Sequence, residues 1–411
     1  MTTKINKDHV RIAILFILMH NCFDIFGITQ KIFGLINYYD LVFIYSLYLF
    51  LLYWMKCGKN YFSGIFTKVV LFVPILILLS SMMACLFYNQ SIISGILTQR
   101  AWFISSLVYF PIRYLIKNKK LDLESFFNIL YFIVFIEVSI YLIQYLLGAD
   151  HYFLKVRYTY RYNSIRIVAN TAYMELVLIY AMNKILIKEK VIKNIFFVVI
   201  ILSYIFIVNK GRGQCFVILA IIALTILFSK IRIISKIIII SIFIIIANIS
   251  FLETNVITEF SSIIFEGQKD ATYNVRQESK EFYFDTMNEE PLSWILGYGM
   301  QNTTNENSNK ATGVSQGYLI TDNGIYGFIF SYGILGLIWY IYSLIIQIKY
   351  GGKFLIRNGD CIIIIRIIAN ILSITTNSNF FYTYQSFSSI LIFCLIDILN
   401  INYSNKGRIN K

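Results

Sequence analysis

The chain has 411 residues, of which 58% are hydrophobic and only 14% charged, and its mean hydropathy is +0.67. Soluble domains contain about 45–50% apolar and about 25% charged residues, so this composition excludes a soluble enzyme and predicts a membrane protein. The net charge is +14, but most of the 36 Lys and Arg residues lie between apolar runs, so they do not indicate nucleic acid as a partner.

Apolar runs of roughly 20 residues, the length that crosses a bilayer as a helix, recur along the chain. The first run follows basic residues as a signal peptide does, but it is long for one and contains His20 and Asp24, so we interpret it as a membrane helix. The runs together predict an all-α integral membrane protein with about twelve transmembrane helices. These are expected near 10–28, 36–55, 69–88, 92–112, 125–147, 165–187, 194–209, 213–229, 233–252, 322–348, 360–377 and 381–400.

The basic residues between these runs predict the orientation of the chain. With a cytoplasmic N-terminus, most Lys and Arg residues fall in cytoplasmic segments, as the positive-inside rule requires. Both termini are therefore expected in the cytoplasm. The exceptions gather in three extracytoplasmic places, which are the Tyr-rich loop 148–166, the turn 209–213 and the long loop 253–321.

This pattern divides the chain into three parts. Residues 1–252 predict a transmembrane bundle of about nine helices, 253–321 a large extracytoplasmic loop subdomain, and 322–411 about three C-terminal helices with a basic cytoplasmic tail. Within the loop subdomain, Asn274 to Met287 is expected to be helical, whereas Gln301 to Lys310 is expected to be too polar to pack.

The turn from Lys210 to Gln214 combines two cations with two glycines directly before an apolar helix. A helix start has unpaired N–H groups, and glycines permit an unusual backbone, so the turn suits a phosphate group. An ordinary turn, whose cations reach the lipid headgroups, is the alternative.

Two other sets of cations are predicted outside the membrane. Arg157, Arg161 and Arg166 alternate with tyrosines, and such a surface could stack sugars and bind phosphates through forked hydrogen bonds. An interfacial aromatic belt would explain the tyrosines equally well. Arg276 and Lys280 would share one face of the loop helix, although a solvated surface helix has the same pattern.

Acidic residues give further candidates. Asp322 stands where the long loop ends and an apolar helix begins, so it is expected as a helix N-cap or as a carboxylate of the site, and the two roles are compatible. Charged residues within the apolar runs are costly in lipid and are expected to face the interior of the bundle. These residues are Asp24, Arg100, Glu137, Glu175, Arg366 and Asp397.

The order of these motifs resembles the O-antigen polymerase/ligase superfamily. A Gly-Arg-Gly turn is followed by two runs, a large loop with an arginine in a helix, and a polar start to a Gly-rich helix. The matching segments are Lys210 to Gln214, Asn274 to Arg276, Pro291 to Gly299, Asp322 to Gly324 and Tyr332 to Leu337.

The resemblance implies a metal-independent membrane glycosyltransferase, without a cofactor, at the outer face of the bacterial inner membrane. A Wzy-type polymerase of this kind moves a growing glycan from undecaprenyl diphosphate onto a new lipid-linked repeat unit. Its partners would be the lipid-linked oligosaccharide, membrane lipid and a chain-length regulator protein, and not nucleic acid. The ligase branch has a His where this chain has Asp322, which favours the polymerase.

The resemblance and the chemistry together give each candidate residue a role. Arg212 and Arg276 would hold the diphosphate, because fixed arginine forks neutralise the charge on the leaving phosphate. Asp322 would orient or deprotonate the acceptor hydroxyl. The expected substrate-binding residues are Lys210, Arg157, Arg161, Arg166 and Lys280.

Three other functions remain open from the sequence. An O-antigen ligase would share the fold. A polysaccharide flippase or other transporter would also have about twelve spans, but it would not need so large a loop. A structural component of an assembly complex would not explain the cations outside the membrane.

Overall fold

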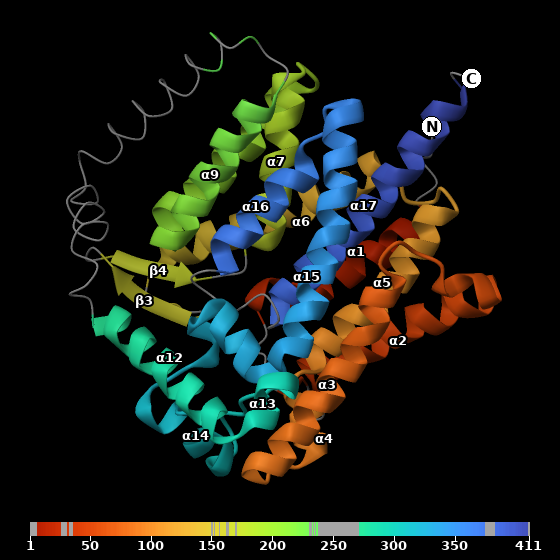
Figure 1. Cartoon of the computed structure of the whole chain (residues 1–411). Helices are drawn as coiled ribbons and strands as arrows, with labels where there is room; N and C mark the ends of the chain where they lie inside the picture. Colours follow the sequence, from red (N-terminus) through yellow and green to blue (C-terminus); the bar gives the residue numbers. More distant parts are fainter. Residues whose placement is uncertain are drawn as a thin grey trace.

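The described part of the chain is a bundle of α-helices with a layer of shorter helices at one end (Figure 1). The computed structural model describes residues 6–25, 31–32, 36–148, 151, 153–155, 157–161, 164–168, 171–229, 232, 234, 236, 271–374 and 383–409.

The first half of the chain forms nine α-helices among these residues. They are α1 (Lys7–Met19), α2 (Tyr38–Cys57), α3 (Thr67–Tyr88), α4 (Ile92–Thr98), α5 (Arg100–Lys117), α6 (Leu123–Leu147), α7 (Ala172–Leu186), α8 (Val191–Ser203) and α9 (Arg212–Phe228).

The second half supplies the layer at the lower end in Figure 1 and three further long helices. The helices are α12 (Ala271–Glu289), α13 (Pro291–Leu296), α14 (Glu306–Ala311), α15 (Gly324–Asn358), α16 (Ile362–Ile374) and α17 (Thr383–Ile409). We call the end of the bundle that carries α12 to α14 the loop end.

Five of the described helices are long and apolar enough to cross a membrane. They cover Tyr38–Cys57, Thr67–Tyr88, Leu123–Leu147, Val191–Asn209 and Gly324–Arg357. Shorter apolar helices cover Gln214–Phe228, Ile362–Leu372 and Phe387–Tyr403. The predicted run 233–252 lies almost entirely outside the described residues, so the expected count of twelve stays a prediction.

The described helices carry large apolar side chains on their outer faces, as helices that could span a membrane do. Large apolar side chains point outward, for example Ile192, which is 86% exposed, and Leu86, which is 63% exposed. Five of the six charged residues within the runs are buried, as predicted. They are Asp24, Glu137, Glu175, Arg366 and Asp397. Arg100 differs, because it begins α5 and lies over the ring of Tyr39.

One buried ion pair joins an early helix to the last one. The Arg113 Nε atom of α5 lies 3.2 Å from the Asp397 carboxylate of α17. The Tyr109 hydroxyl donates a hydrogen bond to the same carboxylate over 2.7 Å. A charge in an apolar interior persists only when it is paired in this way.

The expectation of an all-α fold needs one correction, because the described residues also form two hairpins. The smaller consists of β1 (Lys31–Ile32) and β2 (Ile36–Asn37), and the larger of β3 (Arg157–Arg161) and β4 (Ser164–Val168). The predicted helix 165–187 therefore begins as a strand, in which Arg166 alternates with Ile165 and Ile167 at the period of two that strands require.

Two predicted helices are also interrupted. The run 92–112 forms α4 and α5, which are separated at Gln99. The run 10–28 ends as α1 at Met19, and the next residues, Asn21 to Asp24, all have a positive φ of 45° to 60°. Such a backbone is costly for residues with a Cβ atom.

The loop subdomain is fixed to α15 by glycines at a close approach. The backbone of α15 breaks at Gly333, where φ is +64°, and a Cβ atom there would lie 2.4 Å from the Ile295 carbonyl oxygen. A Cβ atom on Gly297 would lie 2.4 Å from the Ser331 carbonyl oxygen. Next to this contact, the Tyr298 N–H donates to the Phe330 carbonyl over 2.6 Å.

The segment from Gln301 to Lys310 was predicted to be too polar to pack, and this prediction is wrong. Gln301 is 6% exposed and Asn302 is 8% exposed. Their amide groups are buried because they find partners, for example the Ser94 hydroxyl of α4, which lies 2.8 Å from the Asn302 Nδ2 atom.

Candidate functional site

The turn before α9 is shaped by steric crowding around Gly211. A π-helical segment (Tyr204–Asn209) ends at Lys210, whose φ is +49°. The Gly211 N–H then donates to the Asn209 side-chain oxygen over 3.0 Å. A Cβ atom on Gly211 would lie 2.5 Å from that oxygen. The positive φ was expected at a glycine, but it occurs at Lys210, and the glycine is needed for space.

The first turn of α9 begins at Arg212, and no hydrogen bond from a described side chain caps it. The N–H groups of an uncapped first turn carry the positive end of the helix dipole. This is the backbone arrangement that suits an anion. The side chain of Arg212 lies outside the described residues, so its predicted role stays a prediction.

Arg166 of β4 connects the larger hairpin to this turn. Its Nε atom donates to the Asn209 carbonyl over 2.6 Å, and its Nη2 atom would lie 2.9 Å from a Cβ atom on Gly211. The guanidinium group therefore packs directly on the turn. It brings together two of the three places at which the sequence predicted cations outside the membrane.

The pairing of β3 with β4 shows on which face of the hairpin the other two arginines, Arg157 and Arg161, lie. Thr159 is paired with Arg166, and side chains alternate along a strand. Positions Arg157 and Arg161 therefore lie on the same face of the hairpin as Arg166. The side chains of these two residues are outside the described set.

Lys210 lies against the end of α6. Its Nζ atom is 5.3 Å from the centre of the Tyr145 ring and 3.5 Å from the Tyr145 hydroxyl. A cation over the face of an aromatic ring is attracted by the electrons of the ring. Lys210 is thus held at the same turn as Arg166.

A row of polar residues on α6 holds the chain that leads into the hairpin. The Gln144 side-chain oxygen accepts from the Phe153 N–H over 2.9 Å, and its amide donates to the His151 carbonyl over 3.2 Å. The Tyr141 hydroxyl donates to the Asp24 carboxylate over 2.7 Å, and the Lys155 N–H donates to the Asp24 carbonyl over 2.6 Å.

The same row explains why the unusual backbone after α1 persists. Glu137, one turn before Tyr141 on α6, lies 3.1 Å from the His20 Nε2 atom, and both side chains are fully buried. The Asn21 amide donates to the Asp24 carboxylate over 2.7 Å. Residues 20–24 are therefore held at several points to α6 and to the segment before the hairpin.

The other predicted residues, Arg276, Lys280 and Asp322, belong to α12 and to the segment before α15. The Ser279 hydroxyl of α12 lies 3.0 Å from the Asn323 side-chain oxygen, and the Asn323 amide donates to the Leu319 carbonyl over 3.0 Å. The Lys280 Nζ atom is 4.9 Å from the centre of the Tyr326 ring. Ser279 and Lys280 therefore place α12 against the first turn of α15.

Asp322 and Arg276 lie at this second cluster. The Asp322 side chain is exposed, and Asn323 rather than Asp322 occupies the N-cap position of α15, so the cap alternative for Asp322 is wrong. The Arg276 Nε atom is buried and makes no hydrogen bond with the described residues. An arginine donor in this state gains from a ligand that accepts from it.

Tyr283 of α12 lies near the same carboxylate. Burial, and then the charge of Asp322, raise the pKa of the Tyr283 hydroxyl above its ordinary value. The hydroxyl is thus protonated at any physiological pH, and it can act only as a neutral hydrogen-bonding group.

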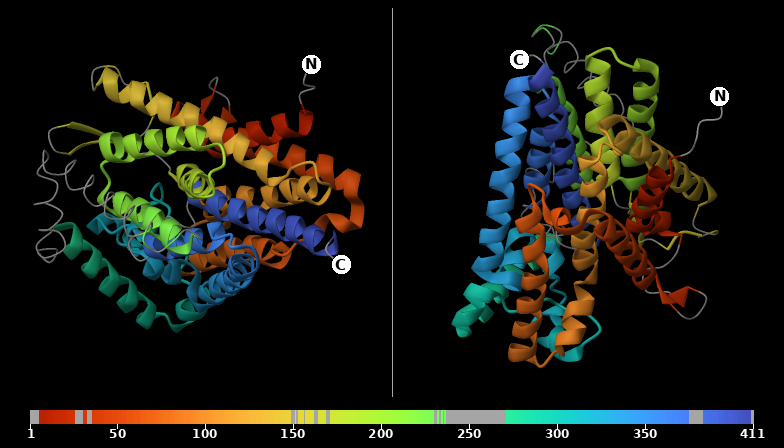
Figure 2. Two further views of the ribbon diagram at one scale, coloured as in Figure 1. Left: turned by 90° about the horizontal axis from the view of Figure 1, so that it is seen from above. Right: turned by 90° about the vertical axis from the view of Figure 1, so that its right-hand side faces the viewer.

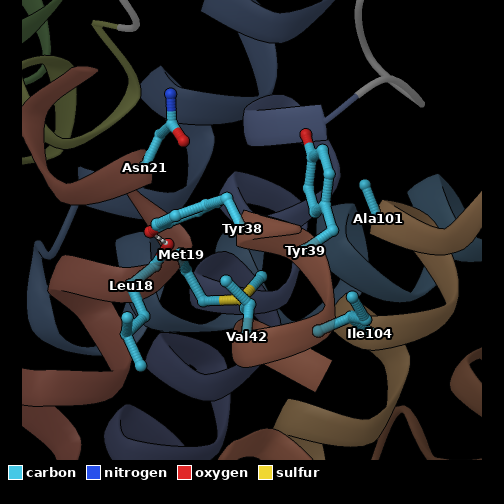
Figure 3. Close-up of a pocket in the computed structure, with 8 residues that line it drawn as sticks. All are labelled: Leu18, Met19, Asn21, Tyr38, Tyr39, Val42, Ala101 and Ile104. Atoms are coloured by element: carbon cyan, nitrogen blue, oxygen red, sulfur yellow. Dashed lines mark hydrogen bonds between the residues drawn. The ribbon is translucent and has the colours of Figure 1, made fainter. Parts of the chain in front are cut away.

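A small cavity lies away from both clusters, between the end of α1 and the starts of α2 and α5. Its volume is about 10 Å³, close to the space of one water molecule. Figure 3 shows its mainly apolar lining, with the Tyr38 hydroxyl bonded to the Leu18 carbonyl. The cavity is too small for a sugar or a lipid headgroup.

Several residues of these clusters were not singled out from the sequence. Asn209 ends a helical segment and Ser279 lies within α12, and the sequence gives no sign of their partners elsewhere in the chain. Gln144 lies on α6, seven residues and hence about two turns after Glu137. Its position near the end of a long apolar run was the available signal.

The structure shows the general class of this protein, but the comparisons find no related protein. The described residues form a helical protein with five helices suited to a membrane, and two polar clusters with Arg and Lys residues lie at the turn before α9 and at the start of α15. No family model matches the chain, and no curated protein sequence matches it.

Proposed function

We propose that the chain is an integral-membrane polysaccharide polymerase. It would transfer a growing glycan from undecaprenyl diphosphate onto a new lipid-linked repeat unit, in O-antigen or capsule synthesis. The observation that carries this proposal is the uncapped start of α9, against which Arg166 and Lys210 are held. A lipid-linked diphosphate is an anion that must bind close to the membrane surface, and this turn has the charge and the N–H groups for it.

The chemistry requires charge to be neutralised on the leaving diphosphate. Arg212 at the start of α9 and Arg276 of α12 would do this without a metal ion, because a guanidinium group binds phosphate oxygens in pairs. Lys280 and the hairpin residues Arg157, Arg161 and Arg166 would add contacts to the substrate.

Asp322 would act on the acceptor. Its exposed carboxylate next to the start of α15 is accessible to a sugar hydroxyl, which it would orient or deprotonate for attack on the anomeric carbon. A residue that contacts a large acceptor glycan must be exposed, as Asp322 is. A buried carboxylate could not reach the glycan.

The proposed orientation places the loop end on the extracytoplasmic side of the membrane. The bundle would lie in the bacterial inner membrane with both termini in the cytoplasm, because most Lys and Arg residues then fall on the cytoplasmic side. The partners would be the lipid-linked oligosaccharide, membrane lipid and a chain-length regulator protein.

Two alternative functions, an O-antigen ligase and a polysaccharide flippase, are distinguished from polymerisation by the same experiment. A ligase would transfer the glycan to another lipid, and a flippase would move the lipid-linked unit across the membrane. The docking of the loop subdomain through Gly297 and Gly333 favours transfer over flipping, since a rigid outer layer suits a binding site.

Deletion of the gene in its native host tests the proposal. The surface glycan of the deletion strain is run on a gel beside that of a complemented strain. Loss of the long ladder with retention of a single repeat unit would support polymerisation. Loss of every unit would point to flipping or ligation, and an unchanged ladder would exclude all three functions.

A further inference from the structure

A buried polar network joins four helices directly beneath the turn that begins α9. At its centre is Glu175 in the first turn of α7, which is 6% exposed. Its carboxylate forms an ion pair with Arg366 of α16, which is 5% exposed. The Arg366 Nη2 atom donates to the Ser388 hydroxyl of α17 over 2.9 Å.

The same carboxylate also receives two hydrogen bonds from segments that carry the candidate cations. The Gln214 Nε2 atom donates to Glu175 Oε1 over 2.8 Å, and Gln214 lies in the first turn of α9, two residues after Arg212. The Thr171 hydroxyl donates to the same oxygen over 3.1 Å. Thr171 follows β4, the strand that carries Arg166.

Glu175 therefore connects the two segments that form the anion-binding turn. With three donors on one carboxylate, it is poorly suited to accept a proton from a substrate. Its position instead suits a group that holds Gln214 and Thr171 in place. Figure 1 shows α7, α9 and α16 side by side, and each of these pairs of helices is in contact.

Stability alone is a weak reason for this arrangement. A buried ion pair commonly contributes no more to folding than apolar side chains of similar size, because both charges lose their hydration. The chain contains a second such pair, Arg113 with Asp397, which touches neither cluster of the candidate site. The two pairs differ in that only the first is bonded to the turn before α9.

We propose that Glu175 is a positioning residue for the diphosphate site, which acts through Gln214 and Thr171. Arg366 keeps its carboxylate charged inside the membrane, so that the carboxylate holds the first turn of α9 and the end of the hairpin in fixed register. The inference rests on the proposed function, and it assigns the carboxylate beneath the site a different role from that of Asp322.

Binding of undecaprenyl diphosphate to the full chain in lipid nanodiscs tests this inference. The variant Glu175→Leu/Arg366→Leu removes both charges together, so no charge is left unpaired, and we expect the fold to be retained. We expect its dissociation constant to rise about tenfold or more while its unfolding temperature stays within a few degrees of the wild type, by analogy with other groups that orient ligand-binding residues.

The matched control is Arg113→Leu/Asp397→Leu, in which the dissociation constant should not change. Gln214→Leu is a second variant that removes no charge, and it should weaken binding as the Glu175 variant does. It keeps the inference testable if the double variant does not fold.

The outcomes separate the two proposals. If the wild type does not bind undecaprenyl diphosphate, the proposed function is wrong and the inference falls with it. If the wild type binds and both Glu175→Leu/Arg366→Leu and Gln214→Leu bind equally well, only the inference is overturned. A rise in the dissociation constant in the control pair as large as that in the Glu175 pair would also overturn it, because the effect would then be general to buried ion pairs.

Discussion

Single atoms decide the shape of the turn before α9. The Asn209 side chain folds back to accept from the Gly211 N–H, and this leaves no space for a Cβ atom at position 211. Lys210 adopts a positive φ although it is not a glycine. The turn thus stores a small strain where the proposed anion binds, as is common at functional sites.

Gly211→Ala is expected to open this turn. The added methyl group would lie 2.5 Å from the Asn209 oxygen, so the turn must shift, and we expect a loss of about 1–3 kcal/mol in the free energy of unfolding. Thermal unfolding of the detergent-solubilised protein measures this loss. Gly352→Ala is the control, since a Cβ atom there has no neighbour within 4 Å and should leave stability unchanged or slightly higher. Equal stability of the two variants would contradict the steric explanation.

Arg212→Ala and Arg276→Ala are each expected to abolish the glycan ladder in a complemented deletion strain. The physical reason is the loss of a guanidinium fork on the diphosphate, and Lys at either position should restore the ladder poorly because its point charge lacks the fork. Immunoblots of the membrane fraction check that the variants insert normally. Normal chain lengths in one of the Ala variants would remove that residue from the site.

The individual residues show what a sequence can reveal about a site. The turn from Lys210 to Gln214 could be singled out because cations outside the membrane violate a general rule of topology. Glu175 and Arg366 could be identified as inward-facing, since charges avoid lipid. Their pairing could not be predicted, because nothing in a linear sequence specifies which of several inward-facing charges meet.

At the scale of elements, the loop subdomain owes its position to the break in α15. The helix has 35 residues, but the positive φ at Gly333 interrupts it where α13 arrives. The break lets the backbone of α13 approach within van der Waals distance of α15. A continuous helix would hold the loop subdomain further from the bundle.

Gly333→Ala is therefore expected to loosen α12 and α13. An L-residue at this φ and ψ, a region that essentially only glycine adopts, costs about 1–3 kcal/mol, and the added Cβ atom would also collide with the Ile295 carbonyl oxygen. Hydrogen exchange of residues 274–296 should become faster in this variant. Gly317→Ala is the control, because Gly317 has a φ of +86° and a Cβ atom there would have no neighbour within 4 Å. The variant therefore introduces backbone strain without a collision, and it should leave hydrogen exchange in α12 nearly unchanged. Equal hydrogen-exchange rates of residues 274–296 in the two variants would show that the contact at Gly333 does not hold α12 and α13 in place.

The elements also show where prediction from sequence succeeds and where it stops. Long apolar runs such as α3 and α6 were predicted within a few residues, because the bilayer thickness sets their length. The hairpin of β3 and β4 was missed since the apolar residues of Ser164–Val168 continue into α7, and composition does not mark the change of period. The break at Gln99 was missed because its partner, the Tyr332 hydroxyl, comes from a distant helix.

The whole molecule has two ends of different character, and this difference fixes a testable orientation. The end opposite the loop end carries basic residues at the ends of α5 and α7 and at the start of α8, some of them in exposed ion pairs such as that of Lys190 with Glu124. Figure 2 shows the bundle from two further directions, with the last turns of α17 away from α12 to α14.

Cysteine labelling in whole cells should confirm this orientation. In a background without the six native cysteines, Gln316→Cys at the loop end should react with a membrane-impermeant maleimide in intact cells. Asn60→Cys at the opposite end should react only after the membrane is permeabilised. Both positions are exposed, so access through the membrane is the only difference. The reverse pattern would contradict the proposed orientation.

The two buried ion pairs have a consequence for the order in which the protein assembles. Asp397, which pairs with Arg113, and Arg366, which pairs with Glu175, lie in α17 and α16, far along the chain from their partners. During synthesis, Arg113 and Glu175 must therefore remain unpaired in the nascent chain until α16 and α17 have entered the membrane. A chain that ends at Asp360 should be degraded, whereas one that ends after Tyr403 should accumulate, as immunoblots of membranes would show. The C-terminal helices would thus act as a checkpoint for the completeness of the chain.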